Sequence, residues 1–185
     1  MIWRLFRRED SRNRAIETLH ARINDASRAS GLYTGLGVPD TVEGRFECLS
    51  LHVILVLRRL ETLPAPAADV AQDLVNSVFL QLDSSLRELG VGDFGVPKRM
   101  KKLGAAFYGR AENYGAALAT QDEPALALAL ARNVMGTAEA EAGAGLARYV
   151  TASASRLQAA SLDELLGEGP RFPHPDAFAD PRSAP

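Results

Sequence analysis

The stretch CLSLHVILVLRRL, residues 48–60, decides the fold because it is the most apolar run in the chain. Apolar residues cover nearly its whole helical circumference, whereas a helix at a protein surface confines them to one stripe. It is shorter than the roughly 20 apolar residues of a membrane-spanning helix, and it carries His52, Arg58 and Arg59. The run therefore predicts a central, buried helix and no transmembrane segment.

Signals on both sides of this run bound the central helix. Asp40 followed by Glu43 is a capping-box pattern, which predicts that the helix begins near Thr41 with Asp40 as its N-cap. Pro64 and Pro66 predict its end, because proline breaks a helix interior.

Apolar spacing of three and four residues predicts further helices along the chain. They are expected at residues 11–31 (capped by Ser11 and ended by Gly31), 69–90, 97–114, 125–135 and 137–160, and in a short last turn that Ser161 and Glu164 cap. No longer alternating strand pattern occurs, so the fold class is all-α. The chain divides into a basic amphipathic segment at residues 1–10, one compact helical domain at residues 11–166, and a proline-rich tail at residues 167–185 that is expected to be disordered.

Composition supports one folded domain. The chain has 185 residues, of which 46% are hydrophobic and 24% charged, close to the average of folded proteins. Its formal net charge of −2 provides no global basic field, so we expect no nucleic-acid partner. Cys48 is the only cysteine, which excludes an internal disulfide.

Three patterns suggest chemistry, and each has a simpler explanation. Residues 90–95 match G-x-G-x-x-G, but the expected helix before them favours a helix connection over a phosphate-binding turn. Cys48 and His52 could pair as nucleophile and base or as half a metal site, yet their apolar helix favours core residues. A carboxylate pair among Asp83, Glu88 and Asp93 is typical of a solvated helix face. We therefore predict no catalytic residue, metal or cofactor.

Two basic segments could bind a partner. The first is a run at the start of the fourth predicted helix, beside Phe107, and it comprises Lys98, Arg99, Lys101, Lys102, Tyr108 and Arg110. It would suit an anionic lipid, an acidic protein or a nucleic acid, or it is a solvated face. The second is at the N-terminus, where membrane contact or packing on the body would involve Trp3, Arg4, Phe6, Arg7 and Arg8.

Two blocks of sequence resemble the ubiquinol-cytochrome c chaperone family. The first is GVPDTVEGRF at residues 37–46, followed by Leu51 and His52. The second runs from LDSSLRELGVGD at residues 82–93 through VPKRMKK at residues 96–102 to FYGR at residues 107–110. The resemblance covers roughly residues 19–135.

The resemblance implies a helical, non-enzymatic assembly factor. Such a protein binds newly made cytochrome b and assists its assembly into complex III, with a small partner protein in some members. The client-binding face is then expected to include Asp40, Arg45, Asp83, Arg87, Glu88, Asp93, Lys98, Arg99, Lys101, Lys102, Tyr108 and Arg110. The expected location is cytoplasmic, at the inner face of the membrane where cytochrome b is inserted.

Three alternatives remain open on sequence alone. Arg45, Asp83 and Arg87 could form an internal ion-pair network that braces helix to loop, because buried charges are normally paired. The protein could also be a peripheral membrane scaffold with another client, or an enzyme or small-ligand binder that uses Cys48 and His52 or the turn at residues 90–95.

Overall fold

A computed structural model describes the backbone of residues 2–179 and the side chains from residue 11 of that range. The elements in chain order are α1 (Ile2–Ser27), α2 (Ser30–Thr34), α3 (Val42–Glu61), α4 (Ala67–Glu88), α5 (Val96–Ala119), α6 (Glu123–Leu130), the π-helical turn η1 (Ala131–Met135), α7 (Ala140–Leu157), α8 (Leu162–Gly167) and the 3₁₀ turn η2 (Pro175–Phe178). Residues 2–179 contain no strand, so the all-α prediction is confirmed.

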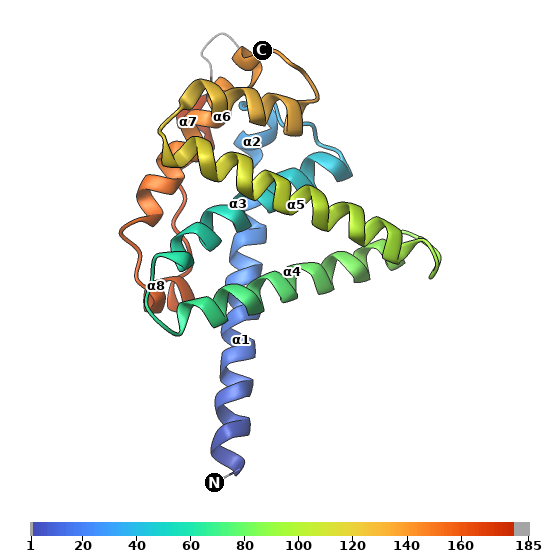
Figure 1. The fold of residues 1–185 in the computed structure, drawn as a ribbon, viewed down its shortest axis with the longest axis vertical. Helices are drawn as coiled ribbons and strands as arrows, with labels where there is room; N and C mark the ends of the chain where they lie inside the picture. The colour runs from blue at the N-terminus through green and yellow to red at the C-terminus, as the bar shows by residue number, and fades with distance from the viewer. Residues whose placement is uncertain (1, 180–185) are drawn as a thin grey trace.

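Helix α3 lies at the centre of the fold (Figure 1). Its residues 50–56 are all buried, which covers every side of the helix. Helices α1, α4, α5 and α7 each pack against it. The prediction of a central buried helix is therefore confirmed, and apolar burial on this scale is the main favourable contribution to folding.

The alanine-rich segments form a tightly packed pair, α6 and α7. A Cβ atom on Gly143 of α7 would lie 2.1 Å from the carbonyl oxygen of Ala127 in α6. Only glycine fits there, and the neighbouring small side chains let the two backbones approach. Few large side chains are needed because the backbones themselves fill the space.

Several predicted boundaries differ from the structure. Helix α1 begins at Ile2, so Ser11 lies inside the helix and does not cap it. It ends at Ser27, and Gly31 belongs to the short helix α2. The capping box of Ser161 and Glu164 is present as predicted.

The prediction of a disordered tail from residue 167 is wrong as far as residue 179, because this stretch packs on the core. The ring of Phe172 packs edge-on against His52 of α3, with ring centroids 4.7 Å apart. Pro175 is buried, and the ring of Phe178 packs edge-on against Tyr149 of α7. Aromatic rings thus anchor a segment whose composition resembles that of a tail. Residues 180–185 lie outside the described residues.

The N-terminal half of α1 extends beyond the other helices (Figure 1). The membrane contacts predicted for Trp3, Arg4, Phe6, Arg7 and Arg8 fall on side chains outside the described residues. Within the described part of the chain, none of the helices combines the length and apolar character needed to cross a bilayer.

We predict that Phe172→Ala lowers the free energy of unfolding by about 2–3 kcal/mol, because it removes an aromatic ring packed on the core. The exposed His174 in the same segment supplies the control, and His174→Ala should change stability by less than about 0.5 kcal/mol. Urea titration of both variants checks this. Equal, small effects would show that the segment does not pack on α3.

Candidate interaction surface

Helices α4 and α5 leave the core together as an arm, which we define as residues 82–106. The buried residues of α4 are Ala67, Val70, Leu74 and Val78, all before the arm. Leu82 and Leu86 are only partly buried. Figure 1 shows α4 and α5 converging on their connecting turn at one side of the molecule. The rings of Phe79 and Phe107 pack edge-on, 5.7 Å apart, where the arm joins the core.

Ion pairs stiffen the α4 side of the arm. Arg87 Nε lies 2.7 Å from a carboxylate oxygen of Asp83, and Arg87 Nη1 lies 2.6 Å from one of Asp93 in the connecting turn. Half-buried Asp83, exposed Arg87 and exposed Asp93 therefore tie the helix end to the turn. The alternative of an internal network among Arg45, Asp83 and Arg87 is not found, because Arg45 pairs with Asp40 instead. The Asp83–Arg87 pair lies in solvent, where such pairs contribute at most about 1 kcal/mol. Glu88 is exposed beside it.

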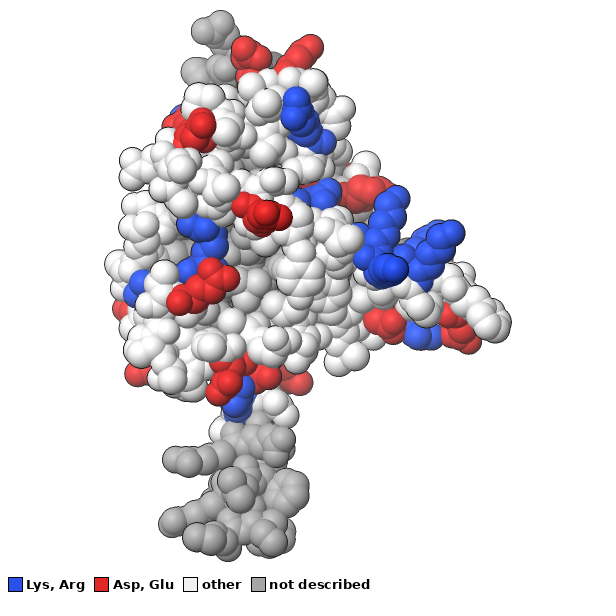
Figure 2. Space-filling view, in the orientation of Figure 1, with Lys and Arg blue, Asp and Glu red and all other residues white. Residues whose placement is uncertain are grey.

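The α5 side of the arm is basic. Lys98, Arg99, Lys101 and Lys102 are all exposed, and none of the four has an ion-pair partner among the described residues. Figure 2 shows Lys and Arg side chains gathered on this side of the arm. Tyr108, at the base of the arm, is 60% exposed.

The structure corrects the placement of Arg110, which was expected in this exposed run. Its guanidinium forms a two-pronged ion pair with Glu47 of α3, and both side chains are largely buried. The pair joins α3 to α5 at the base of the arm. Arg110 therefore braces the core, the role that sequence reasoning had considered for Arg45, Asp83 and Arg87.

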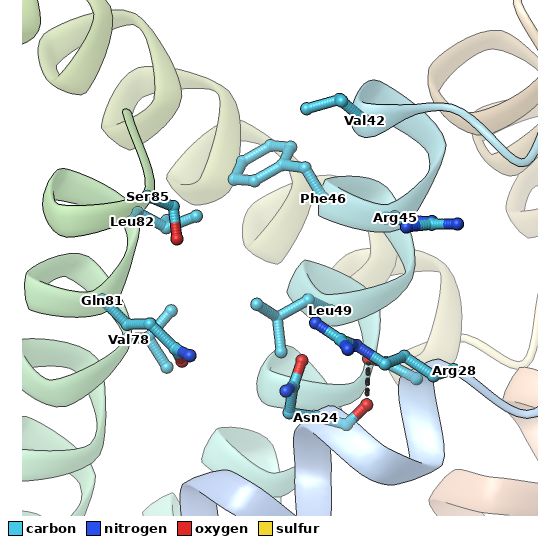
Figure 3. Close-up of a pocket in the computed structure, with 11 residues that line it drawn as sticks. Asn24, Arg28, Val42, Arg45, Phe46, Leu49, Val78, Gln81, Leu82 and Ser85 are labelled. Carbon is cyan, nitrogen blue, oxygen red and sulfur yellow. Dashed lines mark hydrogen bonds between the residues drawn. The ribbon is translucent and has the colours of Figure 1, made fainter. Parts of the chain in front are cut away.

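A groove of about 200 Å³ opens between α3 and α4, with the end of α1 as its floor (Figure 3). Its walls are mainly apolar and include Val42, Phe46 and Leu49 of α3 and Val78 and Leu82 of α4. Small-molecule sites usually occupy about 300–1,000 Å³, so this groove suits one or two side chains of a protein better than a metabolite.

Two arginines stand at the rim of the groove. Arg28 directly follows α1 and reaches toward Leu49, whereas Arg45 comes from the first turn of α3 and points to the side of that helix away from α4 (Figure 3). Arg45 Nε donates to Asp40 at 2.8 Å, and each side chain is 61% exposed. The guanidinium also holds the pKa of the Asp40 carboxyl below its usual range. The rim therefore offers cations beside an apolar cleft.

The backbone around Gly44 fixes the position of this rim. Thr41, and not Asp40, is the N-cap of α3, and its hydroxyl accepts a hydrogen bond from Gly44 N. A Cβ atom on Gly44 would lie 2.0 Å from the carbonyl oxygen of Pro39, so the loop can fold over the helix start only with glycine there. Asp40 is thus left free to pair with Arg45.

Cys48 and His52 belong to the core. His52 Nδ1 lies 2.8 Å from the carbonyl oxygen of Cys48, and Nε2 lies 2.7 Å from the Tyr149 hydroxyl, so both ring nitrogens are satisfied. Burial lowers the pKa of His52 to about 4, and it raises the pKa of Cys48 to about 12. A neutral imidazole and a protonated thiol without solvent access form neither a nucleophile with its base nor half a metal site.

The glycine-rich turn is a helix connection, as predicted. Helix α4 precedes it, and Gly90 takes a left-handed conformation with φ of 79°. No cluster of three or more metal-binding side chains occurs in the described portion of the chain.

Sequence reasoning missed the groove and the Glu47–Arg110 pair. Val42, Phe46 and Leu49 line the groove, and Val42 is 63% exposed. Periodicity identifies the apolar face of a helix but not the place where a neighbouring helix leaves that face uncovered.

Comparisons with known proteins agree with the resemblance. A family model described as ubiquinol-cytochrome C chaperone matches residues 34–172. The crystal structure of the Cbp3 homolog from Brucella abortus is similar to this chain at 39% sequence identity and a TM-score of 0.84. That alignment covers 97% of this chain and 100% of the other. A comparison with curated protein sequences gives no match.

Breaking the buried Glu47–Arg110 pair should lower the free energy of unfolding more than breaking an exposed ion pair does. We predict that Arg110→Gln lowers the free energy of unfolding by about 3 kcal/mol, because it leaves the Glu47 carboxylate buried without its partner. Arg87→Gln, at the exposed pairs, should cost less than about 1 kcal/mol. Denaturant unfolding measures both, and equal costs would contradict the bracing role.

Stability should depend on the protonation of His52. Its pKa is about 4 in the folded protein and near 6.5 when unfolded, so the unfolded chain binds the proton first as pH falls. The free energy of unfolding should therefore fall by about 2 kcal/mol between pH 7 and pH 5 on account of this group. His52→Gln should lack that part of the pH dependence. An unchanged slope in the variant would mean that His52 is not buried as a neutral ring.

Proposed function

The chain belongs to the ubiquinol-cytochrome c chaperone family, and we propose that it acts without catalysis by binding newly made cytochrome b during assembly of complex III. The family match over residues 34–172 carries this proposal. The buried, satisfied Cys48 and His52 support a binding role over a catalytic one.

We assign client binding to the groove between α3 and α4 and to its rim. A membrane protein such as cytochrome b presents apolar helices joined by polar loops. An apolar side chain next to a loop carboxylate would enter the groove and meet Arg28 or Arg45. Arg28 has no ion-pair partner among the described residues, so it is free to pair with a client. We extend the assignment to Asp83, Arg87 and Glu88, which lie beside and beyond the groove residues Leu82 and Ser85 along α4.

The exposure of Arg45 and Asp40 favours a role in client binding over a structural role. Arg45 and Asp40 are more than half exposed and pair only with each other in the described structure, so their loss leaves the core intact. An exposed pair that contributes little stability but stands at an apolar groove is better explained by binding.

We predict that Arg45→Glu captures about tenfold less cytochrome b than wild type in a pull-down from detergent-solubilised membranes that are synthesising complex III. Reversal places a carboxylate beside Asp40 and removes the cation that a client would meet. Circular dichroism should show an unchanged fold.

Arg132→Glu is the matched control, because Arg132 is an exposed arginine outside the groove. It should capture as much cytochrome b as wild type. If wild type captures none while other weak complexes survive, the proposed client is wrong. If both variants lose capture equally, the groove is not the binding face.

A further inference from the structure

The tip of the arm exposes large apolar side chains. Phe94 is 101% exposed and Leu89 is 64% exposed, both in the turn that joins α4 to α5. No described residue covers the Phe94 ring. A fully exposed aromatic ring costs free energy in water. Packing within one copy of the chain does not explain why Phe94 is exposed.

Cations stand just behind this tip. Lys98, Arg99, Lys101 and Lys102 occupy the first turns of α5 and are exposed. Residues 83–102 hold five basic and three acidic residues, whereas the whole chain carries a net charge of −2. Two of the three acids, Asp83 and Asp93, are already paired with Arg87. The field at the end of the arm is therefore positive.

We propose that this tip docks the protein on the surface of a bilayer that contains anionic lipid. Phe94 and Leu89 enter the interface between headgroups and acyl chains, and the α5 cations meet the lipid phosphates. An apolar contact that reaches about 5–10 Å into the interface, backed by basic residues, is the usual arrangement of peripheral membrane binding. This site goes beyond the proposed function and uses residues outside the groove.

The shape of the arm favours a bilayer over an acidic protein. Protein partners usually bury an aromatic anchor in a packed pocket that surrounding residues close against water. The arm instead projects to one side and ends in the turn (Figure 1). A projecting tip buries its apolar side chains most readily in the interface of a lipid bilayer, because lipid molecules can rearrange around it.

Docking by the tip would hold the groove near the membrane. Ser85 lines the groove and lies four residues before Leu89, about 6 Å along α4. A client segment that leaves the bilayer would meet the groove within about two helical turns of the tip.

Vesicle flotation with the full chain tests the proposal. The vesicles contain phosphatidylcholine alone or phosphatidylcholine with phosphatidylglycerol. We expect binding to the anionic vesicles that weakens in high salt. Phe94→Ser should weaken it about tenfold, and Lys101→Gln with Lys102→Gln about 25-fold, since each cation near the surface contributes about fivefold. Neither change touches the core, because all three residues are exposed.

Leu80→Ser and Arg132→Gln are the controls. Leu80 is 72% exposed on α4 away from the tip, and Arg132 is an exposed cation elsewhere, so both variants should bind as wild type does. In a Trp3→Phe, Phe94→Trp double variant the tip carries the single tryptophan, and its fluorescence should shift to the blue on anionic vesicles.

Two results would overturn the proposal. The first is no binding of wild type to anionic vesicles. The second is vesicle binding that the tip variants keep, as an N-terminal anchor at residues 1–10 or a tip that binds an acidic protein instead would give. A detergent extract contains no bilayer, so capture of cytochrome b from it tests the client proposal separately.

Discussion

The burial of α3 on every side is the constraint on which the rest of the structure depends. A helix that is apolar all round has to be covered all round, and α1, α4, α5 and α7 supply that cover. The cover is incomplete beyond Val78, where α4 has buried its last apolar residue and leaves the core with α5. The groove beside the first turns of α3 and the projecting arm both follow from this departure.

Charge is divided between support and recognition along the same helices. Glu47 and Arg110 neutralise each other in a largely buried site and hold α5 to α3. Arg45, Asp40 and Arg87 stand in solvent, where their pairs position side chains but add little stability. A chaperone needs this division, because a surface that binds a transient client has to change partners without unfolding its support.

The sequence predicts the helices well because their apolar spacing reports local burial directly. The central helix at residues 48–60, the turn at Gly90 and the capping box at Ser161 are all present. Contacts between distant segments could not be predicted. Arg110 looks like one more cation in a basic run until Glu47, 63 residues away, is seen beside it. Phe172 sits among prolines that suggest a tail, and the family match extends to that residue although no motif was recognised past Met135.

Site-specific photo-crosslinking during complex III assembly tests the central claim most directly. A benzophenone amino acid at Val42, which lines the groove and is 63% exposed, should crosslink to cytochrome b. The same probe at Glu141, exposed at the start of α7 on a helix that does not line the groove, should not. Crosslinks to cytochrome b from Glu141 but not from Val42 would contradict the account, and so would none from either position in a variant that still supports assembly.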